Sequence, residues 1–257
     1  MHVSEIVFFR AIVQILIAAA FLAYQRQSPW GNNPKMLVMR GFFGSMGLLC
    51  YFYSLQVMPL SNALVIHYLS PILTTLFALW MGDEQVQNKQ WVFFALSFTG
   101  VVIVNGVSSL VTLEGIAAGL GGAVFSALAY NTIRRLKGKE NPNVVVLYFP
   151  LVTLPISLLM PVVGFGQWIM PVGNQWVWLL LTGIFTQIGQ FFMTRAYQES
   201  ETKVVSAISY AGIIWGTGFG LFLFHEDYSI WQYLGMALVI MGMVLNVRLN
   251  RGLGFRR

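Results

Sequence analysis

Long apolar runs separated by short polar breaks extend along almost the whole chain. A membrane-spanning helix needs about 20 predominantly apolar residues, and nine segments approach or reach that length. They lie at 5–24, 36–58, 60–82, 90–107, 115–136, 144–164, 175–197, 203–224 and 229–248. The alternation of apolar and polar residues that marks a membrane barrel is not present in them. Because lipid offers no partner to unpaired backbone groups, the pattern predicts an all-α, polytopic membrane helix bundle with nine spans.

The composition changes this picture only by excluding other classes of protein. Hydrophobic residues make up 57% of the 257 residues and charged residues 9%, against about 25% charged residues in soluble domains. The net charge of +6 does not indicate nucleic acid, because the Lys and Arg residues lie in the breaks between apolar runs and not on one face of a domain. The single cysteine, Cys50, has no partner for a disulfide or a metal site, so we expect no metal and no cofactor. We expect a lipid bilayer to surround most of the chain.

The basic residues fall on one side of the predicted membrane. Of the 15 Lys and Arg residues, 14 lie in or flank the odd-numbered connections and the tail after the last span, and Arg10, inside the first span, is the exception. The 14 are Arg26, Lys35, Arg40, Lys89, Arg134, Arg135, Lys137, Lys139, Arg195, Lys203, Arg248, Arg251, Arg256 and Arg257. Cytoplasmic loops carry the excess of Lys and Arg. We therefore expect a multi-pass protein of the inner (plasma) membrane with a cytoplasmic C-terminus and residue 1 outside.

An internal repeat appears when the sequence is compared with itself at an offset of 142 residues. Between 53 and 105, 13 of 53 positions are identical to the residue 142 positions later, including the polar pairs Gln56/Gln198, Tyr68/Tyr210 and Glu84/Glu226. The offset maps the second span onto the seventh, a step of five helices. An odd step gives the two copies opposite directions through the membrane, as in the inverted repeats of secondary transporters. We expect two repeats, at 1–110 and 111–257.

Several motifs together resemble a known family. They are Glu5-Ile6-Val7-Phe8-Phe9-Arg10 at the start of a span, Tyr51-Phe52-Tyr53-Ser54-Leu55-Gln56 followed by Pro59-Leu60-Ser61-Asn62-Ala63, then Tyr68-Leu69-Ser70-Pro71 and Gly82-Asp83-Glu84. With them the chain resembles the EamA-type carriers of the drug/metabolite transporter superfamily over essentially its whole length. The resemblance implies ten helices arranged as five plus five, both termini in the cytoplasm, and a central cavity that opens alternately to the two sides.

The chain departs from that pattern by one helix, the first of the first repeat. At the offset of 142 the fifth span, which starts near 115, maps onto position −27, ahead of Met1. We expect the chain to be a truncated or alternatively started form of a ten-helix protein. The alternative is a true nine-helix carrier whose cavity is completed by another subunit, for example in a homodimer.

Candidate substrate-binding residues begin on the third span, where small and polar side chains recur at helical spacing. Ala63, His67, Ser70 and Thr74 form this stripe, Tyr68 lies beside it, and the offset carries it onto the eighth span with Ser209 and Tyr210. Packing between helices explains the small residues equally well. For His67 a cavity is the favoured interpretation, because ionisable groups at membrane depth face an interior or water. We expect His67, Tyr68, Gln190 and Tyr210 to line one cavity.

The remaining candidates lie on the eighth span and on four others. They are Arg10, Tyr51, Tyr53, Tyr130, Asn131, Gln187, Gln190 and Trp215. Gln187 and Gln190 are three residues apart and must point inward, because an unpartnered amide is costly in lipid. Trp215 offers a surface for an aromatic or cationic substrate or is a core residue, and Arg10 either pairs with an anionic group or extends to the interface.

These features favour a secondary transporter of a small organic metabolite over an enzyme or a channel. None of the nine acidic residues lies in the middle of a span, so His67 is the one visible candidate for a proton relay, and uniport or exchange is as well supported as ion coupling. The chain contains no HExxH and no GxSxG motif. Nothing in it resembles a selectivity filter. The sequence does not identify the substrate or the direction of transport.

Overall fold

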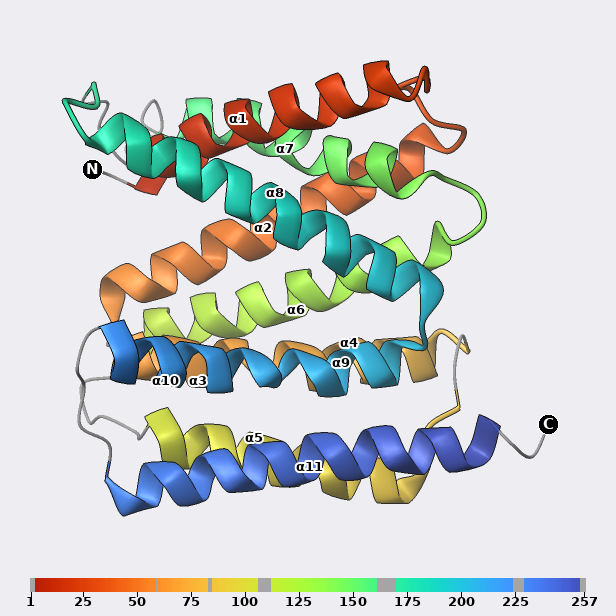
Figure 1. Cartoon of the computed structure of the whole chain (residues 1–257), viewed down its shortest axis with the longest axis vertical. Coiled ribbons are helices and arrows are strands. Elements are labelled where there is room, and N and C mark those ends of the chain that lie inside the picture. Colours follow the sequence, from red (N-terminus) through yellow and green to blue (C-terminus); the bar gives the residue numbers. More distant parts are fainter. Residues whose placement is uncertain are drawn as a thin grey trace. The chain divides into compact units, whose positions relative to one another are not determined.

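The computed structural model describes residues 3–58, 60–82, 85–105, 112–160, 170–223 and 229–254 (Figure 1). The motif residues Pro59, Asp83, Glu84 and Glu226 lie outside these ranges. All regular secondary structure in the described residues is helical. The helices are α1 (Val3–Tyr24), α2 (Pro34–Val57), α3 (Leu60–His67), α4 (Ser70–Trp80), α5 (Asn88–Asn105), α6 (Leu113–Arg135), α7 (Pro142–Leu159), α8 (Gln175–Glu199), α9 (Thr202–Ser209), α10 (Ala211–Leu223) and α11 (Ile230–Gly254). The chain is therefore a polytopic helical bundle, as predicted.

The helices follow the predicted spans, with two spans divided into two helices each. Within the described residues, seven segments are long and apolar enough to cross a membrane, and the helix at Asn88–Val104 is apolar but shorter. One of the seven, Asn62–Trp80, comprises α3 and α4 together. The predicted span 203–224 corresponds to α9 and α10, which are 8 and 13 residues long.

The helices assemble into two compact units, each built from two stretches of the chain. The first unit contains Met1–Leu48 and Leu128–Glu199, and the second contains Leu49–Ala127 and Ser200–Arg257. Each unit combines segments from the two predicted repeats. The predicted repeat boundaries, 1–110 and 111–257, describe a duplication along the sequence and stay a prediction.

In the second unit, α5 and α11 pack along their length and make equivalent contacts at the offset of 142. Gln90 donates to Asn246 Oδ1 at 3.4 Å, and Gln232, 142 residues later, donates to the carbonyl of Val104, 142 residues before Asn246, also at 3.4 Å. The first turns of α5 and α11 also have equivalent hydrogen bonds. Gln90 Oε1 accepts from the backbone N–H of Gln87 at 3.0 Å, and Gln232 Oε1 accepts from the backbone N–H of Ser229 at 2.8 Å. Such reciprocity is expected of an antiparallel pair of related helices.

The first unit repeats a second contact in the same way. Gly41 of α2 lies so close to α7 that a Cβ there would be 2.6 Å from Val152 Cγ2. Gly183 of α8, at the offset of 142, lies equally close to α1, where a Cβ would be 2.6 Å from Val13 Cβ. Small residues permit this close approach of membrane helices. A duplicated sequence would give paired contacts of this kind, and the duplication stays a prediction.

Candidate functional site

The two divided helices are interrupted at equivalent positions. α3 ends at His67 and α4 begins at Ser70, while α9 ends at Ser209 and α10 begins at Ala211, so that Tyr68 and Tyr210 both lie at a break. Pro71 explains the first break, because proline has no N–H to donate within a helix. The second break has no proline. The backbone keeps helical dihedral angles at Leu69 (φ −71°, ψ −21°) and Tyr210 (φ −64°, ψ −18°), so each interruption is a local change in helical hydrogen bonding and not an unwound segment. Interruptions at corresponding places in two halves also occur at the substrate sites of secondary transporters.

Tyr68 and Tyr210 contact each other in the second unit. Their rings stack with centroids 5.8 Å apart and an angle of 16° between the planes. The hydroxyl of Tyr210 donates to the backbone carbonyl of Tyr68 at 3.0 Å. A side chain of one interrupted helix thus satisfies a carbonyl at the break of the other, as backbone groups inside a membrane require.

Replacing Tyr210 with Phe should therefore destabilise the protein. The change leaves the Tyr68 carbonyl without its donor, and the loss is expected to lower the free energy of unfolding by about 1 kcal/mol. Tyr68→Phe is the matched control, because the ring is retained and no described hydrogen bond of the Tyr68 hydroxyl is removed. Thermal unfolding of the two variants in detergent measures the difference. Equal midpoints would show that this hydrogen bond contributes nothing.

His67 and the rest of the predicted stripe also lie in the second unit. The His67 ring is 4.4 Å from that of Tyr51, and its Nδ1 is buried without a hydrogen-bond partner in the described residues. Ser70 and Thr74 are buried, and the Thr74 hydroxyl donates to the Ser70 carbonyl at 2.6 Å. The helical break thus carries aromatic rings, an imidazole and small hydroxyl groups, which suits a mixed polar and aromatic ligand.

In the first unit a buried arginine provides the polar centre that the sequence did not single out. Arg40 lies inside α2 with 1% of its surface exposed, whereas the charge distribution assigns it to the cytoplasmic flank of the first connection. Its Nη2 donates to Gln190 Oε1 of α8 at 2.8 Å, and its guanidinium lies over the ring of Phe149, 5.0 Å from the centroid. The sequence counts Arg40 among the charges that flank the first connection, and its burial inside α2 was not anticipated. A run of apolar residues around it, 36–58, was the signal that could have identified it.

Four more predicted residues are placed in the first unit. The Tyr130 ring stacks on Tyr197 with centroids 4.9 Å apart, and Asn131, next to it on α6, is buried. Arg10 is 7% exposed, and its Nε and Nη2 have no hydrogen-bond partner among the described residues. Gln187 is 8% exposed, and its Oε1 likewise has no described partner.

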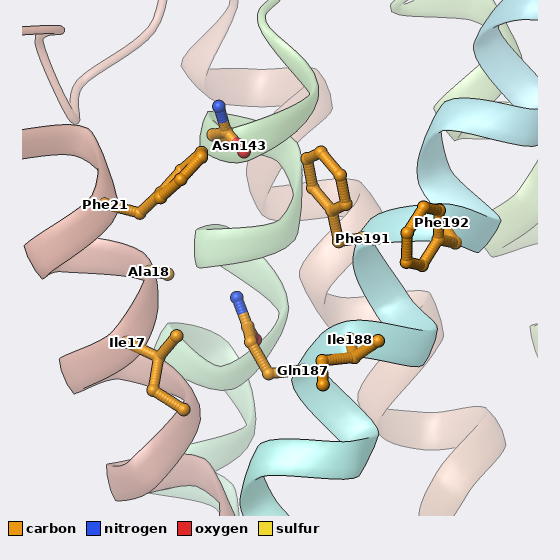
Figure 2. A pocket seen from close by; sticks show the side chains of 8 residues that line it. All are labelled: Ile17, Ala18, Phe21, Asn143, Gln187, Ile188, Phe191 and Phe192. Carbon is orange, nitrogen blue, oxygen red and sulfur yellow. The ribbon is translucent and has the colours of Figure 1, made fainter. Parts of the chain in front are cut away.

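Gln187 also lines a pocket of about 240 Å³ in the first unit. Figure 2 shows this side chain between α1 and α8, surrounded by Ile17, Ala18, Phe21, Asn143, Ile188, Phe191 and Phe192. Most of these side chains are apolar, and Phe21, Ile188 and Phe192 are exposed. The pocket is therefore an apolar hollow with two amide groups, Asn143 and Gln187, in its wall.

The three other predicted residues lie on α10, α9 and α2. Trp215 of α10 is 70% exposed and makes no described stacking contact. Ser209 is exposed, and its hydroxyl donates to the Val205 carbonyl one turn earlier at 2.9 Å. Tyr53 is half-buried in α2. For metals, the described part of the chain holds no group of three or more His, Cys, Asp or Glu residues that could bind one.

The family model described as the EamA-like transporter family matches residues 1–106 and 113–248. The pseudopaline exporter CntI of Pseudomonas aeruginosa is 28% identical over 256 residues, covering 97% of this chain and 87% of the exporter. Human solute carrier family 35 member G1 is 26% identical, covering 93% of this chain and 69% of its own length. The S-adenosylmethionine uptake transporter of Rickettsia prowazekii is 22% identical, covering 88% and 76%.

A solved crystal structure shares the fold, with a TM-score of 0.86, 21% identity, and coverage of 98% of this chain and 90% of the other. The relatives are named as transporters, and none of these names denotes an enzyme. The two family matches together extend over nearly the whole sequence, so the chain is a membrane transporter and belongs to the EamA-like transporter family.

Proposed function

We propose that the protein is a secondary transporter that moves a small organic metabolite across the cytoplasmic membrane by alternating access, as uniport, exchange or ion-coupled transport. The observation that carries the proposal is the interruption of α3–α4 and α9–α10 at Tyr68 and Tyr210. Repeated helix breaks of this kind form substrate sites near the membrane midplane. The relatives named as a pseudopaline exporter and an S-adenosylmethionine uptake transporter support a small organic substrate.

Within this proposal, each unit contributes its own group of binding residues. In the second unit these are His67, Tyr68, Ser70, Thr74, Tyr51 and Tyr210, and in the first unit Gln187, Gln190, Tyr130, Asn131 and Arg10, joined by Arg40. Further candidates are Tyr53 on α2, Ser209 on α9 and Trp215 on α10. His67 is the proposed proton carrier if transport is coupled to protons, because an imidazole at membrane depth suits that task.

A ligand screen followed by uptake tests the function. Purified protein is first heated in the presence of a metabolite library, since a ligand at about 100 times its dissociation constant adds roughly 2.7 kcal/mol of stability. The radiolabelled hit should then enter proteoliposomes at a rate that saturates with its concentration. Chemical conversion of the hit, or uptake that rises linearly without saturation, would contradict a carrier.

The orientation of the chain is a separate proposal that rests on its charge distribution. In a Cys50→Ala background, single cysteines in the connection 134–143 should be shielded from an impermeant thiol reagent in intact cells, and cysteines at 168–174 should react. The physical reason is that cytoplasmic connections hold the Lys and Arg residues. Labelling by mass shift on a gel provides the measurement. The opposite pattern would place the C-terminus outside the cytoplasm.

A further inference from the structure

The guanidinium of Arg40 is held in a fixed position inside the first unit. Gln190 accepts a hydrogen bond from Nη2 at 2.8 Å, and Phe149 supports the guanidinium from one side. Gly44, one turn along α2, leaves the space that the guanidinium needs, because a Cβ there would overlap Arg40 Nη1. Holding an arginine side chain in one geometry costs conformational entropy. The contacts with these three neighbours offset that cost and orient the guanidinium.

The charge of this guanidinium has no counterion in the described residues. Arg40 has one described hydrogen-bond acceptor, a neutral amide, and its buried Nε has no described partner. The described ion pairs, Arg195–Glu199 and Lys203–Glu201, involve other residues. A guanidinium has five N–H donors, so most of its binding capacity remains unused. A buried charge is costly unless it is paired, so these unused donors suit a group that carries negative charge.

Arg10 adds a second buried guanidinium to the same unit. It is 7% exposed, and neither Nε nor Nη2 has a described partner. Gln14, one turn later on α1, is 1% exposed and its Nε2 also has no described partner. The unpartnered groups on these residues are N–H donors. These donors of Arg10 and Gln14 suit an acceptor that carries negative charge.

We infer that Arg40, oriented by Gln190 and Phe149, binds an oxyanion of the transported substrate, a carboxylate or a phosphate group. The inference rests on the proposed function and adds the substrate class, an organic anion. Arginine suits this task better than lysine, because its planar fork binds two oxygens of such a group at once. Arg10 supplies a second positive charge in the same unit.

A charge-introducing variant tests the site without knowledge of the substrate. Gln190→Glu changes one amide into a carboxylate beside Arg40 and should supply the missing counterion. The thermal midpoint of the ligand-free protein should then rise by about 3 °C or more. Gln187→Glu is the control on the same helix, because Gln187 is buried and has no described contact with Arg40, and its midpoint should fall. A fall of the same size in both variants would overturn the inference.

A second experiment compares ligand binding by the parent protein and by Arg40→Gln, to determine which kind of anion binds. The probes are citrate, glutamate, glucose 6-phosphate, inorganic phosphate and the neutral compounds glucose, uridine and nicotinamide. At least one organic anion should raise the midpoint of the parent, with at least tenfold weaker binding to Arg40→Gln, and the neutral compounds should have no such dependence on Arg40. A shift by inorganic phosphate alone, by neutral compounds alone or by no probe would overturn the inference. Neutral binders that are transported would leave the carrier proposal standing, so the two failures are distinguishable.

Discussion

Gly100→Ala should strongly destabilise the second unit, although it adds a single methyl group. A Cβ on Gly100 of α5 would lie 2.5 Å from the Gly235 carbonyl oxygen and 2.8 Å from the backbone nitrogen of Val239, both in α11. Backbone atoms cannot turn aside as a flexible side chain can, so the two helices must separate. Overpacking of this kind costs about 1–3 kcal/mol or more, and Gly100→Leu should prevent folding.

The repeat provides a second test of the same prediction. Gly242, at the offset of 142 from Gly100, meets the Phe93 carbonyl and Ser97 of α5 in the equivalent way, so Gly242→Ala should have an effect of similar size. Gly189→Ala is the control, because nothing lies within 4 Å of a Cβ at that position and alanine favours the helix by about 1 kcal/mol. Thermal midpoints and the yield of monodisperse protein in detergent measure the effects. If Gly100→Ala is as stable as Gly189→Ala, the close α5–α11 contact is wrong.

Glu140→Ala should produce the second large loss of stability, in the first unit. The Glu140 side chain is 7% exposed, and its Oε1 accepts hydrogen bonds from the backbone N–H groups of Asn32, at 2.5 Å, and Asn33. These groups directly precede α2, where the helix dipole also favours a negative charge. Hydrogen bonds to a charged group contribute about 1.5–3 kcal/mol each, so the variant should lose about 3 kcal/mol.

An exposed carboxylate serves as the control for Glu140. Glu199 pairs with Arg195 at 2.7 Å, but both side chains are more than half exposed, at 61% and 52%. Such a pair on one helix contributes about 0.3–0.5 kcal/mol, so Glu199→Ala should change the midpoint little. Detergent unfolding curves of both variants provide the comparison. An unchanged midpoint in Glu140→Ala would show that Glu140 does not tie the 24–34 connection to the 135–142 connection.

The course of the helices was predictable because apolar length alone determines which segments cross a membrane. Their division was only partly predictable: Pro71 indicates a break in the third span, but the eighth span breaks at Tyr210 without a proline. The equivalence of Tyr210 and Tyr68 in the repeat was the available signal. The hydroxyl of Tyr210 donates to the Tyr68 carbonyl and so joins the two breaks.

The candidate site was less predictable, because in a membrane protein the lipid-facing and buried faces of a helix are both apolar. Gln190 was expected to point inward, and its partner Arg40 was not anticipated. The distribution of Lys and Arg predicts a side of the membrane, and it does not indicate whether a charge near a helix end is buried. Trp215, expected in a core or against a substrate, is 70% exposed, and no periodicity in its helix distinguishes those environments.

Counterflow of a labelled substrate tests the proposal of a carrier most directly. Proteoliposomes are loaded with a high concentration of the unlabelled compound found by thermal shift, and a trace of the labelled compound is added outside. An alternating-access carrier exchanges the two, so label should accumulate transiently above its outside concentration and then decline. Uptake that reaches the outside concentration without overshoot, or that is unaffected by internal substrate, would contradict the proposal.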